Sequence, residues 1–148
     1  METQQIEPTI LLVEDTPTDV LLTKEAFKDS TLTPSIHVAS DGEEALQFIR
    51  QEGKYADAPE PHLILLDLNM PRKNGFEFLE EIKKDPKFSH IPIVILTTSD
   101  SQKDIMECYR GGASSYISKP LDFKDYEQAI LSLETYWFKI NQLPRQTY

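Results

Sequence analysis

The sequence predicts a doubly wound α/β fold built around a five-stranded parallel sheet. Five short apolar runs alternate with five amphipathic segments, and most of the connections between them are short. Such alternation is typical of parallel strands joined by crossover helices, which cover both faces of the sheet. The third run is apolar at four successive positions, as expected for a strand that is buried on both faces.

The apolar runs mark the expected strands, with the third one central in the sheet. They lie at residues 9–13, 35–39, 63–67, 91–96 and 115–118. The connection ahead of the third strand, residues 52–62, is the one long loop and contains two prolines. We expect this loop to run over the surface.

A helix is expected after each strand, at residues 17–29, 42–51, 75–84, 101–110 and 122–140. Thr16 and Pro17 predict the start of the first helix, because a capping hydroxyl and a proline at the first helical position both favour it. Asp41 is expected to cap the second helix. The pairs Asp85-Pro86 and Gly111-Gly112 are signals that end the third and fourth.

The last predicted helix carries a continuous apolar seam at spacings of three and four residues. Its members are Phe123, Tyr126, Ile130, Leu133, Trp137 and Ile140. The first part of this helix can cover the sheet, whereas the part after Leu133 should extend past the domain. We therefore expect a domain at residues 8–133, followed by a helical extension and tail at residues 134–148.

An exposed aromatic seam usually marks an interface. Pairing about a twofold axis would bury the same patch on two copies of the chain. We therefore expect a homodimer whose interface includes Tyr126, Trp137, Phe138 and Ile140. The alternative is that the aromatic residues at positions 136–138 fold back on their own domain.

Composition and charge favour a single cytoplasmic domain that binds neither membranes nor nucleic acid. No apolar run approaches the roughly 20 residues of a membrane span, and the polar start, residues 1–8, does not resemble a signal peptide. The net charge of −10 offers no basic footprint for nucleic acid. The lone cysteine, Cys108, fits a reducing compartment and is expected to be buried.

Four charged residues follow or end three of the expected strands. Glu14 and Asp15 follow the first strand, Asp67 ends the third, and Lys119 follows the last. Because parallel strands align their carboxyl ends at one edge of the sheet, these side chains should lie together. Carboxylates this close raise one another's pKa unless a cation neutralises them, and a hard divalent cation with oxygen ligands would do so.

The set of residues at these strand ends resembles the receiver domain of two-component response regulators, over residues 8–133. Glu14 and Asp15 resemble that family's acidic pair, and Asp67 its phosphoacceptor. Lys119 resembles the family's lysine, which precedes a cis-proline. The resemblance implies a flavodoxin-like fold of five strand–helix units with the strand order 2-1-3-4-5.

Further positions match the same family. Asn69 resembles the residue whose backbone carbonyl binds the metal, and Gly75 fits the tight turn that opens the third helix. Thr97 resembles the switch hydroxyl and Tyr116 the switch aromatic. Thr98 departs from the family, which more often has a small residue there, and could crowd the phosphoryl pocket.

A narrower group of receivers is the most similar. The long 52–62 loop, the Leu-Thr-Thr-Ser run at residues 96–99 and the aromatic residues 136–138 resemble single-domain regulators that partner bacterial phytochrome kinases, notably those of cyanobacteria. The resemblance implies a histidine kinase as phosphodonor and a downstream protein as target. It also implies a signalling protein rather than an enzyme, one that catalyses only its own phosphorylation and dephosphorylation.

The implied chemistry is formation of an acyl phosphate on Asp67. Mg²⁺ would be held by Asp15, Asp67 and the Asn69 carbonyl, with Glu14 acting through a bound water. Lys119 would pair first with a pocket carboxylate and later with a phosphoryl oxygen. Thr97 would then bond the phosphoryl group, Tyr116 would turn inward, and the surface of the fourth helix, fifth strand and fifth helix would change.

Two other classes of function are open to the same residues. A Mg²⁺-dependent phosphohydrolase of the haloacid dehalogenase type also uses an aspartate nucleophile, but it has Asp-x-Asp after its first strand, whereas Asp67 is followed by Leu68 and Asn69 after the third. A phosphorylation-independent scaffold would have no need of an intact Asp15, Asp67, Thr97 and Lys119.

Overall fold

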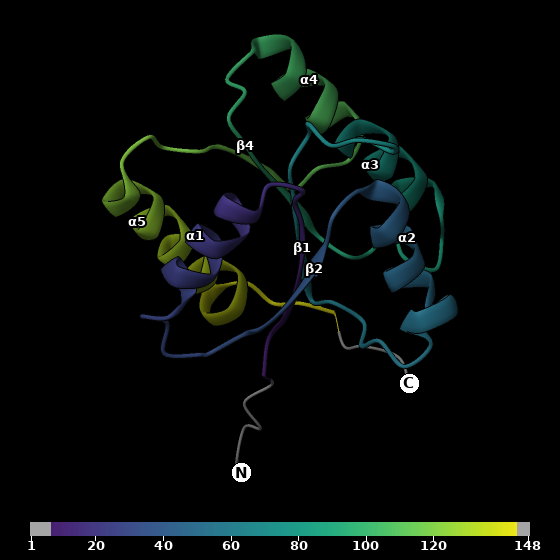
Figure 1. Ribbon diagram of the computed structural model, residues 1–148, viewed down its shortest axis with the longest axis horizontal. Coiled ribbons are helices and arrows are strands. Elements are labelled where there is room, and N and C mark those ends of the chain that lie inside the picture. Colours follow the sequence, from purple (N-terminus) through teal and green to yellow (C-terminus); the bar gives the residue numbers. More distant parts are fainter. Residues whose placement is uncertain (1–6, 145–148) are drawn as a thin grey trace.

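The computed structural model describes residues 7–144 and contains one five-stranded parallel sheet (Figure 1). The strands are β1 (Thr9–Val13), β2 (Ser35–Ala39), β3 (Leu63–Leu66), β4 (Ile93–Thr97) and β5 (Ser115–Ser118), in the order β2-β1-β3-β4-β5. This confirms the predicted fold and strand order. Residues 1–6 of the polar start and residues 145–148 of the tail lie outside the described residues.

Five α-helices cover the two faces of the sheet. They are α1 (Pro17–Phe27), α2 (Gly42–Arg50), α3 (Gly75–Lys84), α4 (Gln102–Arg110) and α5 (Phe123–Glu134). Figure 1 shows α1 and α5 together on one side of the strands and α2 and α3 on the other. Cys108 of α4 is fully buried in the cluster formed on the α2–α3 side. None of the helices within residues 7–144 is long and apolar enough to cross a membrane.

The core consists of two layers separated by the sheet. Alternate residues of one strand enter opposite layers: Leu11 and Val13 pack on the α2–α3 side, whereas Ile10 and Leu12 pack against α1 and α5. All four residues of β3 are completely buried, two in each layer. This double burial explains why the third apolar run shows no polar alternation.

Several predicted helix boundaries hold, and one predicted cap does not. The Asp41 side chain accepts a hydrogen bond from the Glu44 backbone N–H at 2.8 Å and so caps α2, as predicted. Pro17 is the first residue of α1, but the Thr16 side chain makes no capping hydrogen bond, so that part of the prediction is wrong. Strand β4 begins at Ile93 rather than at residue 91, because Pro92 has no N–H to donate to the ladder.

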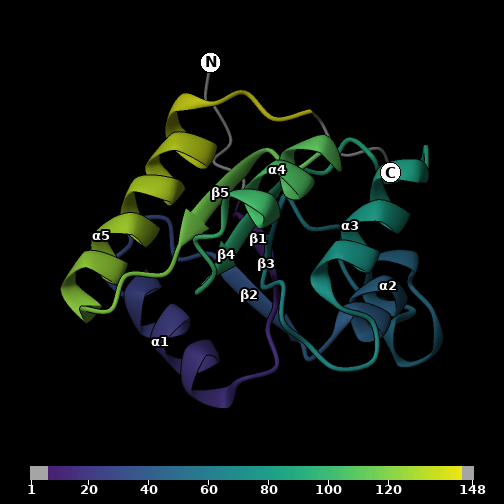
Figure 2. The same cartoon turned by 90° about the horizontal axis from the view of Figure 1, so that it is seen from above.

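The end of the last helix differs from expectation. The α-helix stops at Glu134, and a π-helix (Thr135–Ile140) continues it. Trp137 and Phe138 pack against the layer beneath α1 and α5 instead of extending past it. Figures 1 and 2 show the chain then crossing the end of the sheet opposite the carboxyl ends of the strands, where Leu143 and Pro144 lie beside Pro61 and His62.

Candidate functional site

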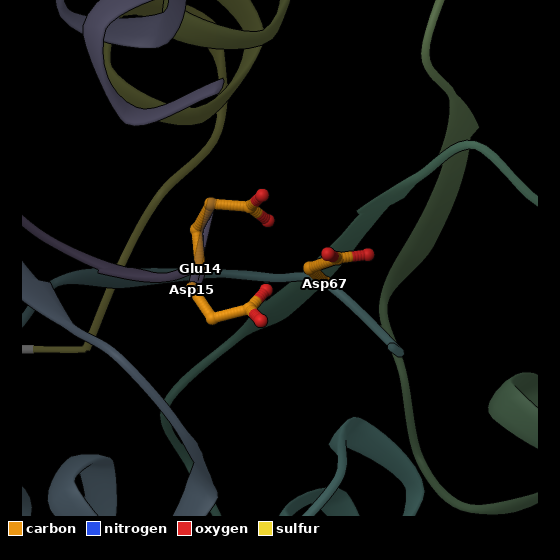
Figure 3. A group of neighbouring side chains, drawn as sticks. All are labelled: Glu14, Asp15 and Asp67. Atoms are coloured by element: carbon orange, nitrogen blue, oxygen red, sulfur yellow. The ribbon is translucent and has the colours of Figure 1, made fainter. Parts of the chain in front are cut away.

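Three carboxyl groups meet at the carboxyl ends of β1 and β3. Val13 pairs with Leu66 in the sheet, so Glu14 and Asp67 occupy the next positions on neighbouring strands, and the Asp67 N–H donates to the Val13 carbonyl at 3.0 Å. Figure 3 shows the side chains of Glu14 and Asp15 extending toward Asp67. One carboxylate oxygen of each residue lies within 4.8 Å of the others. Strand register therefore brings together residues that are far apart in the sequence.

The three carboxyl groups differ in exposure and in charge. Glu14 is only 3% exposed and Asp67 8%, whereas Asp15 faces solvent. Burial raises the pKa of Glu14 from its ordinary value of 4.5 to about 8; a hydrogen bond and the charge of Asp67 act in the same direction, and Lys119 opposes them. In the absence of a cation, Glu14 therefore keeps its proton at neutral pH.

The arrangement fits a hard divalent cation. Every side-chain donor is a carboxylate oxygen, and Oε1 of Glu14 is buried without a hydrogen-bond partner. A buried polar atom of this kind is costly unless something binds it. Beside the carboxylates lies an open hollow, lined by Asp15, Leu68, Asn69, Met70, Pro71, Asn74 and Phe76. Asn69 thus lies next to the carboxyl cluster, in the loop that follows Asp67.

Gly75 lets the start of α3 approach the backbone of Asp67. A Cβ atom at this position would lie 2.5 Å from the Asp67 carbonyl oxygen and 2.7 Å from the Leu68 Cα. The Gly75 N–H donates to the Leu68 carbonyl at 3.1 Å. Only glycine fits this contact, which fixes the backbone directly after Asp67.

The rest of this loop is fixed to the start of α2. The Arg72 guanidinium lies 2.5 Å from the Asp41 carboxylate that caps α2, and the Gly42 N–H donates to the Lys73 carbonyl at 2.8 Å. A Cβ atom on Gly42 would come within 2.6 Å of that carbonyl. The pairing of Arg72 with Asp41 joins residues 31 positions apart, and no motif in the sequence indicated it.

Lys119 reaches the pocket from the loop after β5 and contacts two carboxyl groups. Its ammonium nitrogen lies 3.4 Å from Oε2 of Glu14 and 3.1 Å from Oδ2 of Asp19. Burial acts to lower the pKa of Lys119, but Glu14, Asp67 and Asp19 together raise it above its ordinary value. Asp19 lies in the first turn of α1, and no motif in the sequence indicated that it pairs with the lysine.

The backbone around Lys119 corrects one expectation. Within residues 7–144 every peptide bond is trans, so the cis bond expected before Pro120 is not present. The Lys119 N–H instead donates to the Thr97 carbonyl at 2.7 Å and extends the ladder between β4 and β5 by one bond.

The hydroxyl of Thr97 has no partner, whereas that of Tyr116 has one. Thr97 is completely buried, and its Oγ1 makes no hydrogen bond. Thr98, which departs from the family, is exposed beside the buried Thr97. Tyr116 is half-buried, and its hydroxyl donates to the Ser99 carbonyl at 2.9 Å.

The four residues expected at a dimer interface lie in different environments. Tyr126 is 5% exposed and its hydroxyl lies 2.5 Å from Oγ1 of Thr23 on α1, so it belongs to the core and offers almost no surface to a partner. Trp137 and Phe138 are half-buried, and Ile140 is 66% exposed. An exposed apolar surface on this segment is therefore confined to its last turn and to Tyr136.

Comparison with known proteins relates this arrangement to one family. Residues 10–131 match the response regulator receiver domain. Response regulator Rcp1 of Synechocystis sp. is 40% identical over 135 residues, which are 91% of this chain and 92% of that protein.

Two crystal structures agree with this chain over nearly their full length. The phosphorylated cyanobacterial phytochrome response regulator RcpA has a TM-score of 0.90 at 41% identity, with 95% of this chain and 100% of that chain covered. The Mn²⁺-bound form of response regulator Rcp1 has a TM-score of 0.87 at 39% identity, with 93% and 99% covered.

Proposed function

The chain belongs to the response regulator receiver domain family, and we propose that it accepts a phosphoryl group from a histidine kinase onto Asp67. The observation that carries this proposal is the pocket itself. Asp67 lies beside Glu14 and Asp15, and Lys119 enters the same pocket from the loop after the edge strand β5. The similarity to RcpA, a cyanobacterial phytochrome response regulator by name, favours a phytochrome as the kinase.

The transfer is a substitution at phosphorus. An oxygen of the Asp67 carboxylate attacks the phosphorus of a phosphohistidine, a P–O bond forms, the P–N bond breaks, and its electron pair stays on the imidazole of the kinase. The product is an acyl phosphate. Phosphoryl transfer depends chiefly on positioning and on offsetting charge. Gly75 and the contacts between residues 72–73 and α2 support a fixed position for the Asp67 backbone.

A divalent cation, Mg²⁺ in this proposal, would be held by Asp15, Asp67 and the Asn69 carbonyl, with Glu14 acting through water. When bound, it supplies positive charge that offsets the charge of the phosphoryl oxygens. The unpartnered Oε1 of Glu14 supports such a site. The related Rcp1 structure is described as Mn²⁺-bound, which supports a divalent ion of this class.

The chain's own donors would stabilise the phosphoryl group. Backbone N–H groups directly after Asp67 and the Lys119 ammonium supply positive charge and hydrogen bonds. The buried hydroxyl of Thr97 has no partner in the unphosphorylated protein, so it is free to bond a new acceptor oxygen. These residues would also serve in dephosphorylation, the only reaction beyond its own phosphorylation that the protein would catalyse.

Phosphorylation would reach a partner protein through Tyr116. If Thr97 moves toward the phosphoryl group, space opens beside the Tyr116 ring, which turns inward and gives up its bond to the Ser99 carbonyl. The surface of α4, β5 and α5 then changes. Met106 and Tyr109 of α4 are about half exposed on that surface and would contact the downstream protein, which we place with this chain in the cytoplasm.

We further assign residues 8–133 to the receiver and residues 134–148 to a dimer element. The exposed Tyr136 and Ile140, with the half-buried Trp137 and Phe138, would pair with the same residues of a second copy. A dimer would present two receivers to a dimeric kinase.

Incubation with acetyl phosphate and Mg²⁺ separates the three classes of function. A single phosphoryl adduct that hydroxylamine removes, seen by intact mass, is expected for a receiver. Turnover of many equivalents of acetyl phosphate would instead indicate a phosphohydrolase. No adduct under conditions that label a known receiver would indicate a scaffold and would overturn the proposal.

A further inference from the structure

We propose that Asp19 retains the Lys119 ammonium on the α1 side of the pocket in the unphosphorylated protein, and so slows its transfer to the phosphoryl group. Asp19 would thus be a positioning residue that sets how readily Asp67 is phosphorylated. The inference rests on the proposed function, because it concerns the lysine of the same pocket.

The ion pairs of Lys119 carry this inference. The ammonium is nearest to Asp19, at 3.1 Å, and also contacts Glu14 at 3.4 Å. In the part of the chain that the structure describes, it forms no ion pair with Asp67. The Lys119 side chain is 10% exposed and that of Asp19 is 32% exposed, so their pairing is only partly screened by solvent.

Asp19 is held in place by the packing of α1 on α5. It lies in the first turn of α1, where a negative charge is favoured by the helix dipole. Its backbone carbonyl accepts a hydrogen bond from the Thr23 hydroxyl at 2.9 Å, and that hydroxyl lies 2.5 Å from the buried hydroxyl of Tyr126. These bonds fix the backbone that carries the Asp19 carboxylate.

After phosphorylation, the phosphoryl group on Asp67 and the Asp19 carboxylate would compete for the Lys119 ammonium. A phosphoryl group on Asp67 brings new negative oxygens, and Lys119 can bond them only if it gives up its place beside Asp19. The pair with Asp19 is lost in that step, so it opposes phosphorylation. Removing the charge of Asp19 while keeping its shape should therefore speed the reaction.

The test compares initial rates of labelling by acetyl phosphate with saturating Mg²⁺. Asp19→Asn should be faster than the unmodified protein by about two- to fivefold, the range expected for a partly exposed ion pair. Glu25→Gln, which removes an equal charge from the exposed side of α1, serves as the matched control and should leave the rate unchanged.

A second comparison separates retention of the lysine from a general change in charge. In a Lys119→Met background, Asp19→Asn should no longer change the labelling rate, because it acts through the lysine. An equal gain in that background, or a slower or unchanged rate in the presence of Lys119, would overturn the proposal.

The pairing can also be measured without phosphorylation. Asp19→Asn removes both an attraction to Lys119 and a repulsion from the other carboxylates, so the two effects must be separated by a double-mutant cycle. The substitution should raise Tm more in the Lys119→Met background than beside the lysine. Equal changes in both backgrounds would refute the pairing. Labelling of the unmodified protein tests the proposed function independently, so the two failures can be told apart.

Discussion

Glu14 is the most buried carboxyl group of the pocket, and its proton links the stability of the fold to pH. Burial beside Asp67 raises its pKa to about 8, against an ordinary value of 4.5. Between these values the folded protein binds a proton that the unfolded chain has released. This contribution to stability is fully present below pH 4.5 and is lost as the pH rises through about 8.

We therefore expect Glu14→Gln to flatten the pH dependence of unfolding in the absence of divalent cations. Glutamine has no proton to lose, so the free energy of unfolding of the unmodified protein should fall more steeply between pH 5 and about pH 8.5 than that of the variant. Urea titrations in a chelating buffer measure this. Glu25→Gln is the control on an exposed site, and parallel curves for all three proteins would contradict the assignment.

A substitution of Asp15 tests the cation site, because this side chain faces solvent and can bind a cation with little rearrangement of the core. Asp15→Ala should weaken Mg²⁺ binding, slow phosphorylation, and reduce the rise in Tm that Mg²⁺ gives the unmodified protein. It should also stabilise the cation-free protein, since one repelling charge is gone. Thermal unfolding across a Mg²⁺ series measures both effects. An unchanged dependence of Tm on Mg²⁺ would argue against the site.

At the scale of the elements, two helix starts that look alike in the sequence have different caps. Asp41 accepts the Glu44 N–H and also pairs with Arg72, whereas Thr16 makes no capping bond. Asp41→Ala should therefore lower the free energy of unfolding by about 1–2 kcal/mol. Thr16→Ala should change it by less than about 0.5 kcal/mol. Urea unfolding compares the two, and equal losses would mean that the caps are wrongly described.

The contrast between these caps shows what a sequence can predict at this scale. Strand positions follow from short apolar runs, and the carboxyl ends of parallel strands necessarily share an edge. The sequence therefore predicts that Glu14, Asp15 and Asp67 lie together, as they do in the structure. A hydroxyl bond at Thr16, or the pairing of Lys119 with Asp19, depends on rotamers and on contacts between distant elements. Residue spacing does not determine these rotamers or these contacts.

The same limit applies to the last helix. Its seam identifies the face that is apolar, and Ile130 and Leu133 are indeed buried. Periodicity does not say what covers that face. The layer beneath α1 and α5 extends far enough to receive Trp137 and Phe138, so the segment stays on the domain where an overshoot was expected.

For the whole molecule, a substitution of Ile140 tests the proposed homodimer. Ile140 belongs to the apolar seam, ends the π-helix and is mostly exposed. Ile140→Glu should shift the protein toward monomer, because a charge would be buried without a partner. Trp137 is a poorer choice, since it also packs on the core. Leu121→Glu, a fully exposed leucine ahead of α5, is the matched control. Sedimentation equilibrium measures the change. If the unmodified protein is already a monomer, the proposed homodimer is wrong.

Phosphorylation of Asp67 alone is the central claim for the molecule as a whole. The direct measurement is labelling of the unmodified protein, Asp67→Asn and the exposed-site control Asp57→Asn by acetyl phosphate with Mg²⁺, followed by intact mass. We expect one phosphoryl group on the unmodified protein and on Asp57→Asn, and none on Asp67→Asn, with all three folded by circular dichroism. Substantial label on folded Asp67→Asn, at Asp15 or elsewhere, would contradict the claim.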